Sequence, residues 1–419
     1  MSGKHGGVAP RIRYMGSKHA LAPDVARLVK RQRPGPLIDL FCGMCAIGGA
    51  VAPSGRSVWG NDIQRYAAVA ARCQLTARTG PLASPDLASR LTTDFVANMA
   101  ALKDRFGSAL NVEHKRLAAG SVEDYLAGYE RWQHAANSQK VAAECRRLSQ
   151  RPEFPSRLCT LTFSWGYFGL RQSIEIDSVR HAIDAARARG DLTTEQRDWA
   201  VLGLLQAASA CASAPGHFAQ YLRGTTATSV ARIRRQRARS TWATFLQAAD
   251  EHYPFGTRSW RSTNRVLCAD ALGIWPRLSR QKVDHAVIYA DPPYSKDHYS
   301  RYYHVLETLA RYDYPEANGL GRYRPDRFVT PFSLKTQAVA AFQSLFAAAA
   351  SRGWTLILSY PSNGLLQDIA ADLAEELLRD AFPSVHLALQ RPIAHSTMGA
   401  RHGSARSQVD ELVWVAGGS

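Results

Sequence analysis

The chain is organised around one stretch, Ala286–Val287–Ile288–Tyr289–Ala290–Asp291–Pro292–Pro293–Tyr294. A short apolar run that meets a double proline predicts a buried strand with an abrupt end. Both prolines lack a backbone donor and fix their own φ, so the turn is stiff. A carboxylate and an aromatic ring follow the strand at its carboxyl end, where open α/β sheets bind ligands. The turn therefore suits a planar base with an exocyclic amine; the alternative is a rigid turn without chemistry.

A second strand and turn lie near the amino terminus. The run from Pro36 to Asp39 is typical of a buried strand, and the small residues from Gly43 onward let the backbone approach a ligand. Residues 58–62 predict another strand that ends in Asp62, 19 positions after Gly43. A Rossmann-like half holds a ribose diol with an acidic residue at about this spacing. Asp62 could instead cap the helix that begins at Tyr66.

Composition limits the classes of partner and compartment. The 419 residues carry 52 Lys and Arg against 35 Asp and Glu, a net charge of +17, which favours a polyanionic partner. Seven scattered cysteines form no disulfide framework, and Cys42 and Cys45 have no second pair, so no metal site is predicted. No apolar run reaches membrane length and residues 1–10 contain no apolar signal core, so we predict a cytoplasmic protein without membrane contact.

The middle of the chain, residues 81–263, changes to Ala-, Arg- and Leu-rich helical patterns and predicts an inserted domain. The aromatic cluster at 163–168 could stack on bases or pack the insert against the core. A hydroxyl-rich approach then leads into an arginine run that is suited to phosphate contacts, although such runs are often only solvated surfaces. The DNA-binding candidates are Arg223, Arg232, Arg234, Arg235, Arg237 and Arg239.

Four motifs in this order resemble one family. The motifs are Arg-Tyr-Met-Gly-Ser-Lys (13–18), Asp-Leu-Phe-Cys-Gly (39–43), Asn-Asp (61–62) and Asp-Pro-Pro-Tyr (291–294). They resemble the D12 class of S-adenosylmethionine-dependent DNA adenine-N6 methyltransferases, over residues 11–75 and 264–416. The sequence departs from the family at Cys45, which occupies the last glycine position of the turn, where a positive φ would be strained.

The resemblance implies a role for each candidate site residue. Asp291 and the Pro292 carbonyl would accept hydrogen bonds from the adenine amine, with Pro293 stiffening the turn and Tyr294 stacking on the flipped base. Asp62 would hold the cofactor ribose and Asp270, at the end of a strand from Arg265, its adenine. The remaining cofactor-binding candidates, at the methionine end, are Tyr14, Lys18, Asp39, Phe41 and Gly43.

We therefore expect an α/β protein with a doubly wound, Rossmann-like methyltransferase sheet. Residues 1–80 and 264–419 would form the S-adenosylmethionine-binding catalytic domain, and the mostly helical insert at 81–263 would recognise the DNA target. The expected partners are double-stranded DNA and a companion restriction or defence component, with the protein a monomer or weak dimer. An RNA adenine-N6 methyltransferase and a catalytically inactive DNA-binding module are the alternatives.

Overall fold

The computed structural model describes residues 12, 18–295, 299–394 and 408–417. Its centre is a seven-stranded sheet in the order β3-β2-β1-β4-β5-β7-β6, consistent with a methyltransferase fold. Five strands are parallel, and β7 is antiparallel to both of its neighbours. The strands are β1 (Leu37–Asp39), β2 (Val58–Asn61), β3 (Arg265–Leu267), β4 (Val287–Ala290), β5 (Thr355–Pro361), β6 (Ser384–Ala394) and β7 (Gln408–Gly417).

The strand order reverses between β1 and β4. From β1 the chain continues outward to β2 and β3, whereas β4 and β5 extend the sheet on the other side. Ile38 pairs with Ile288 across this junction, and Asp39 and Asp291 stand at or just beyond the carboxyl ends of the two strands. Ligands of open α/β sheets bind in the crevice at such a reversal. The topology alone therefore brings the two carboxylates to one edge of the sheet.

Helices cover both faces of the sheet, which is why its central strands are apolar without alternation. Ile288 points to the face covered by α13, α16 and α17, whereas Val287 and Tyr289 point to the face covered by α1, α2 and α12. A short 3₁₀ turn, η1 (Lys18–Ala20), precedes α1. These helices are α1 (Ala22–Arg31), α2 (Ala46–Val51), α12 (Arg258–Ser262), α13 (Trp275–Ser279), α16 (Ala338–Ala350) and α17 (Leu373–Ala381).

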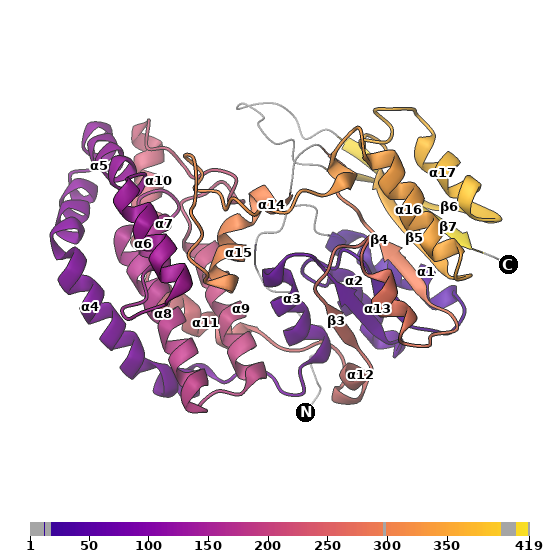
Figure 1. Cartoon of the computed structure of the whole chain (residues 1–419), viewed down its shortest axis with the longest axis horizontal. Helices are drawn as coiled ribbons and strands as arrows, with labels where there is room; N and C mark the ends of the chain where they lie inside the picture. Colours follow the sequence, from indigo (N-terminus) through magenta and orange to yellow (C-terminus); the bar gives the residue numbers. More distant parts are fainter. Residues whose placement is uncertain (1–11, 13–17, 296–298, 395–407, 418–419) are drawn as a thin grey trace.

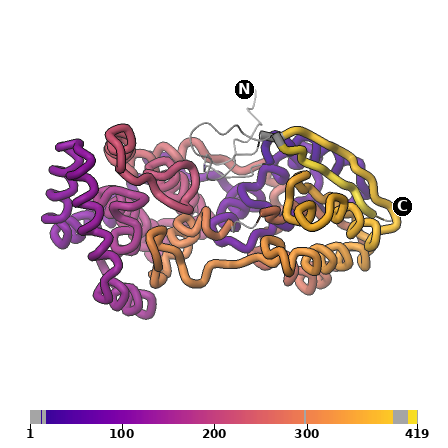
Figure 2. The backbone as a smooth tube through the Cα atoms, turned by 90° about the horizontal axis from the view of Figure 1, so that it is seen from above, coloured from indigo at the N-terminus to yellow at the C-terminus, as the bar shows by residue number. Residues whose placement is uncertain are grey.

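A helical lobe lies beside the sheet (Figures 1 and 2). Its longest member, α4, has 36 residues, which corresponds to about 54 Å at the α-helical rise. Helices α8 and α9 occupy the centre of the lobe, and most of their residues are buried. The lobe contains α4 (Ser84–Ala119), α5 (Val122–Ala136), α6 (Gln139–Gln150), α7 (Leu158–Thr162), α8 (Leu170–Arg189), α9 (Thr194–Cys211), α10 (Ala227–Arg237) and α11 (Thr241–Glu251).

Packing crosses the domain boundaries expected at 81 and 263. Helix α3 (Arg65–Ala71) and, beyond β4, helices α14 (Tyr299–Tyr302) and α15 (His304–Arg311) contribute to the same buried cluster as α8 and α9. The Tyr66 amide donates to Glu307 Oε2 at 3.2 Å, which ties α3 to α15. The lobe therefore packs on α3, α14 and α15 through one apolar core.

The aromatic cluster at 163–168 is part of that core. Phe163, Trp165, Tyr167 and Phe168 are all buried, and the Tyr167 hydroxyl donates to the Phe218 carbonyl at 2.5 Å. Of the two roles predicted for this cluster, the structure therefore favours packing, because none of these rings is exposed for stacking on a base. In the described residues, no helix combines the length and the apolarity needed to cross a membrane.

Candidate active site

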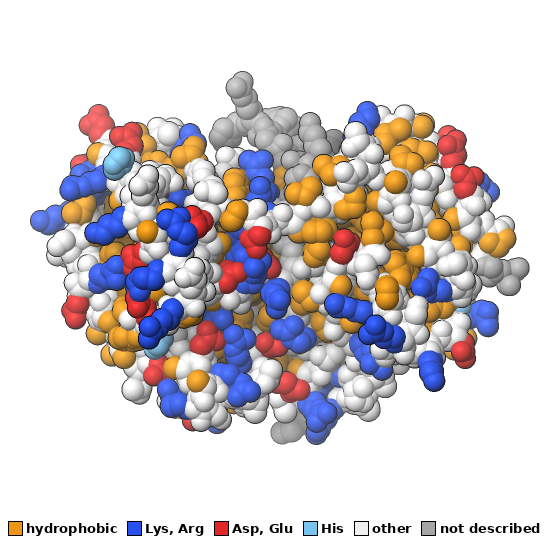
Figure 3. Space-filling view, viewed as in Figure 1, with side chains coloured by type: hydrophobic (Ala, Val, Ile, Leu, Met, Phe, Trp, Pro, Cys, Tyr) orange, Lys and Arg blue, Asp and Glu red, His pale blue; other side chains and the backbone are white. Residues whose placement is uncertain are grey.

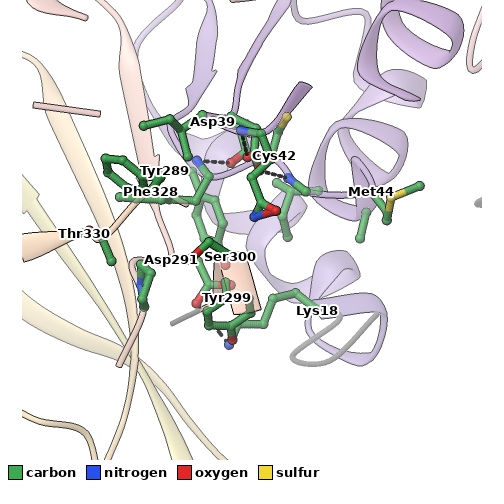
Figure 4. A pocket seen from close by; sticks show the side chains of 18 residues that line it. Lys18, Asp39, Cys42, Met44, Tyr289, Asp291, Tyr299, Ser300, Phe328 and Thr330 are labelled. Carbon is green, nitrogen blue, oxygen red and sulfur yellow. Dashed lines mark hydrogen bonds and ion pairs between the residues drawn. The ribbon is translucent and has the colours of Figure 1, made fainter. Parts of the chain in front are cut away.

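One cavity opens over the carboxyl ends of β1 and β4 (Figure 4). It encloses about 900 Å³ of empty space, including the part that is open to solvent. Its walls bring together seven of the candidate residues: Lys18, Asp39, Phe41, Gly43, Asp62, Asp291 and Pro293. The wall also includes Met44, Ile63, Gln64, Tyr289, Tyr299, Ser300, Phe328 and Thr330, of which Phe328 and Thr330 were not predicted.

The glycine turn has the backbone that its sequence pattern requires. Gly43 has φ +47°, and Cys45 has φ +61° in the left-handed region just before α2. This conformation favours glycine and strains a residue with a Cβ atom. The Cys45 side chain is completely buried, so the small thiol occupies space that a larger side chain could not enter without displacing its neighbours. The departure from the family pattern therefore keeps the shape of the turn.

Asp62 fastens this turn to the end of β2. Its Oδ2 accepts a hydrogen bond from the Gly43 amide at 3.1 Å, and its Oδ1 accepts one from the Gln64 amide at 2.9 Å. The N-cap residue of α3 is Gln64, so Asp62 is not the cap of that helix. Burial raises the pKa of Asp62 to about 6, although these backbone hydrogen bonds act in the opposite direction.

A second buried carboxyl group stands at the end of β1. Asp39 Oδ1 accepts a hydrogen bond from the Phe41 amide at 3.3 Å. Burial raises the pKa of Asp39 well above its ordinary value, and the nearby Asp291 and Asp62 raise it further. Three acidic side chains thus face one cavity, and Lys18 is the cationic residue among the described side chains that line it. Such a cavity electrostatically favours a cationic ligand.

Asp291 belongs to a buried group of three charges. Lys18 Nζ lies 3.1 Å from Asp291 Oδ1 and 2.8 Å from Glu411 Oε1. Burial raises the pKa of Asp291 to about 7; Lys18 lowers it and Glu411 raises it. Burial lowers the pKa of Lys18, but the two carboxylates outweigh this and raise it above its ordinary value. Glu411 was missed in the sequence analysis, because its partner lies at the other end of the chain.

Pro292 and Tyr294 complete the proline turn. Pro292 is buried, and the Tyr294 carbonyl accepts a hydrogen bond from the Leu365 amide at 2.8 Å. The Tyr294 ring is half-buried with its centroid 5.7 Å from Lys18 Nζ. Neither Pro292 nor Tyr294 is among the described residues that line the cavity. The Tyr294 ring therefore lies beside the ammonium group of Lys18.

Two cofactor-binding candidates are not placed at the cavity. Asp270 is partly exposed, its Oδ1 accepts a hydrogen bond from the Leu272 amide at 3.0 Å, and it is not among the described lining residues. Tyr14 lies outside the described residues. The structure therefore does not bring Asp270 to the wall that Gly43 and Asp62 share, and the role of Tyr14 stays a prediction.

A second chamber continues from the cavity towards α15. It has about 670 Å³ of empty space and shares Ile63, Gln64, Ser300 and Phe328 with the first. His304 Nε2 lies 2.9 Å from the Phe218 carbonyl, which only accepts, so Nε2 carries the hydrogen and Nδ1 is an acceptor. Four buried polar atoms of its wall lack a hydrogen-bond partner among the described residues: Gln64 Oε1, Ser300 Oγ, His304 Nδ1 and Arg327 Nε.

The arginine run divides into an exposed set and one buried member. Arg223, Arg232, Arg234, Arg235 and Arg239 are exposed on or beside α10, on a lobe where Figure 3 shows many basic side chains. Arg237 is buried and lies 3.3 Å from Glu113 Oε1, and it donates to the Trp165 carbonyl at 2.6 Å. The prediction that Arg237 contacts DNA is corrected on this point. It shares the inward face of α10 with Val230 and Ile233, at helical spacing.

Comparison with known proteins points to one family. The model of the D12 class N6 adenine-specific DNA methyltransferases matches residues 14–105 and 274–355. The type II methyltransferase M.FokI of Planomicrobium okeanokoites is 24% identical over 59% of this chain and 34% of its own length. The modification methylase LlaI of Lactococcus lactis subsp. lactis is 36% identical over 26% of this chain and 17% of its own length. The modification methylase StsI of Streptococcus sanguinis is 20% identical over 85% of this chain and 45% of its own length.

The chain thus spans less than half the length of the curated relatives that it matches. The two segments matched by the family model contain β1, β2 and β4 with the glycine turn, Asp62 and the Asp-Pro-Pro-Tyr turn. These are the elements that form the cavity at the reversal of strand order. Residues 14–105 and 274–355 are therefore similar to the D12 class of N6 adenine-specific DNA methyltransferases.

Proposed function

We propose that this protein transfers a methyl group from S-adenosylmethionine to N6 of an adenine that is flipped out of duplex DNA. One observation carries the proposal: Asp291 opens on the same cavity as the glycine turn that Asp62 holds. The family match and the modification methylases among the relatives support the same reaction. An RNA substrate is the second candidate, because the same turn suits any adenine base.

The cavity fits this methyl donor in charge. S-adenosylmethionine supplies a methyl group on a positively charged sulfur. Among the described side chains of the wall, the three acidic groups Asp39, Asp62 and Asp291 outnumber the one cation, Lys18, so a cationic ligand is favoured there. We assign the ribose to Asp62 and the methionine end to the turn at Phe41–Gly43.

We assign the adenine of the methyl donor to the second chamber rather than to Asp270. Ile63 and Phe328 supply apolar walls there, directly after the ribose-binding position. Gln64 Oε1 and His304 Nδ1 are acceptors suited to an exocyclic amine, and Arg327 Nε is a donor suited to a ring nitrogen. An adenine ring would satisfy buried polar atoms that otherwise lack partners among the described residues.

The residues of the turn act by positioning and by charge placement. The N6 lone pair of adenine is delocalised into the ring, so the amine is a poor nucleophile. Asp291 and the Pro292 carbonyl accept hydrogen bonds from the amine and localise electron density on its nitrogen. The ionised carboxylate of Asp291 is the stronger hydrogen-bond acceptor, and Lys18 favours this ionised form. We assign stacking on the base to Tyr294, whose ring lies beside Lys18 of the cavity wall.

We propose that the helical lobe contacts the DNA target. The exposed arginines of α10 carry positive charge on the lobe, and phosphate contacts of this type supply much of the affinity for DNA. Since relatives are named modification methylases, a companion restriction component is part of this proposal. We expect the protein to act as a monomer or weak dimer in the cytoplasm.

The test is methyl transfer by the pure protein. Radiolabelled S-adenosylmethionine is supplied with amplified bacterial DNA, which carries no modified bases, and in parallel with ribosomal RNA. The proposal expects label in N6-methyladenine of DNA, and its loss in Asp291→Ala with the calorimetric affinity for the methyl donor retained. Label in RNA alone selects the second candidate. No affinity for the methyl donor identifies an inactive module.

A further inference from the structure

We propose that Glu411 is a positioning residue of this site, which holds Lys18 beside Asp291 and thereby fixes the place and the charge of the carboxylate that faces the reacting amine. This inference rests on the proposed function. Glu411 lies outside the residues that the family model matches, and it does not line the cavity among the described residues. It acts on the turn only through the group of three charges.

The position of Glu411 is fixed by strands β7 and β5 of the sheet. It belongs to β7 and is opposite Pro361 in the register with β5. Its side chain is completely buried, and its Oε1 accepts a hydrogen bond from the Ser359 hydroxyl of β5. The same Oε1 lies 2.8 Å from Lys18 Nζ. A short turn, η1, carries Lys18, so this contact on the central sheet fixes where its ammonium group stands.

The charges in this group do not balance. Two carboxylates share one ammonium group, so the fully ionised group carries a net charge of −1 in a buried place. The titratable groups around Asp291 are Lys18 on η1, Asp39 on β1, Tyr289 on β4, Tyr294 in the turn and Glu411 on β7. A simple ion pair would need only one acid. Glu411 therefore competes with Asp291 for Lys18 and makes Asp291 bind its proton more tightly.

The variant Glu411→Gln separates charge from shape. The amide oxygen still accepts hydrogen bonds from Lys18 and Ser359, while the negative charge is lost. Lys18 then balances Asp291 alone, so the acid limb of kcat/KM should move to lower pH by about one unit. The measurement uses amplified bacterial DNA and radiolabelled S-adenosylmethionine. A limb at the wild-type pH overturns the proposal. Glu376→Gln, at an exposed position of α17, is the matched control and should leave the acid limb of kcat/KM at the wild-type pH.

The variant Glu411→Asp tests position at constant charge. Its carboxylate is one methylene shorter and cannot keep both Ser359 and Lys18 in place. We expect the acid limb to stay near the wild-type pH while kcat/KM falls about tenfold, a loss of about 1.4 kcal/mol in transition-state stabilisation. The affinity for S-adenosylmethionine should not change. Wild-type kcat/KM in this variant would contradict the positioning role.

A measurement without turnover keeps this test separate from the proposed function. Between its ordinary pKa near 4 and its folded pKa of about 7, Asp291 binds a proton in the folded state that the unfolded chain has lost. Its contribution to stability therefore falls as the pH rises through this window. The fall in Tm should be smaller in Glu411→Gln than in the wild type. An equal fall overturns the inference, even if the protein methylates nothing.

Discussion

The amide of Gly43 and the carboxylate of Asp62 are joined by a hydrogen bond of 3.1 Å between Gly43 N and Asp62 Oδ2. This bond connects the turn after β1 to the end of β2, so one side chain both shapes the glycine turn and faces the cavity. A residue with these two tasks cannot change for one without affecting the other. Substitutions at Asp62 should therefore weaken ligand binding more than the removal of a single ligand contact would.

Replacing Asp62 by Asn tests this double role. The variant keeps the size but loses the charge and one acceptor oxygen, so it can accept only one of the hydrogen bonds from Gly43 and Gln64, and that bond becomes neutral and weaker. We expect about a 10- to 100-fold loss of affinity for S-adenosylmethionine, since a hydrogen bond to a charged group contributes about 1.5–3 kcal/mol. Titration calorimetry measures the change, and Asp284→Asn at an exposed position is the control. Unchanged affinity would remove Asp62 from the ligand site.

The pH dependence of the reaction should reflect Asp291. Its pKa of about 7 means that a protonated, less accepting carboxyl group predominates at lower pH. Because the ionised form is the stronger acceptor for the amine, kcat/KM should fall about tenfold for each pH unit below 7 and level off above it. The rate is measured with amplified DNA from about pH 5 to 9. In Asp291→Asn the limb should be absent from the residual activity; its persistence would assign the titration to another group.

The stability of the lobe should depend on His304. Burial lowers its pKa to about 3, whereas an unfolded histidine titrates near 6.5. Its contribution to stability is complete above about pH 6.5 and is lost as the pH falls towards 3, because only the unfolded chain takes up the proton. Between about pH 6.5 and 4.5, the Tm of His304→Phe should therefore fall less than the Tm of the wild type. His386→Phe, at an exposed position, is the control and should follow the wild type.

The exposed arginines of α10 should set the salt dependence of DNA binding. Replacing three of them by Gln should weaken binding and reduce the slope of log K against log salt by up to about 3, because each phosphate that is no longer neutralised lowers the slope by about 0.9. Fluorescence anisotropy at several salt concentrations measures this slope. An unchanged slope would show that these side chains only face solvent. The variant combines Arg232, Arg234 and Arg235; a control with equal charge loss combines Arg277, Arg280 and Lys282, which are all exposed.

Arg237 should behave as part of the core rather than as a DNA contact. Its removal leaves the buried Glu113 carboxylate without its cation, so Arg237→Met should lower the free energy of unfolding by about 3 kcal/mol. Arg235→Met, two residues earlier on the exposed side of α10, should change it by less than about 0.5 kcal/mol. Urea unfolding measures both. Equal stability of the two variants would contradict the buried ion pair.

The sequence predicted the centre of the sheet because β1, β2, β4 and β5 are short apolar runs with clear ends. It did not predict β6, whose residues alternate between partial and full exposure near the edge of the sheet. The prediction for the arginine run was based on the number of charges alone. It did not take into account that Arg237 lies on the same buried face of α10 as Val230. Seven of the candidate site residues meet at one cavity because they follow parallel strands whose ends must coincide.

Other parts of the site leave no local signal. Glu411 meets Lys18 only because β7 returns between β5 and β6. Phe328 and Thr330 reach the cavity from an irregular segment with no pattern of its own. The three-dimensional path of the chain determines these contacts. The spacing of residue types along the sequence does not predict that path. The packing of α3 and α15 against the lobe likewise leaves no local signal in the sequence.

The core shared by α3, α15, α8 and α9 limits how new specificity can be engineered. A chimaera with exchange points at 81 and 263 would carry a foreign surface against Tyr66 and Leu306, which are both completely buried here. The smallest exchangeable unit has to include residues 65–77 and 299–314 along with the lobe. Because α3 begins three residues after Asp62, any such transplant also changes the segment that positions Asp62 at the cavity. Under the proposed function, target choice and turnover would therefore change together in such a chimaera.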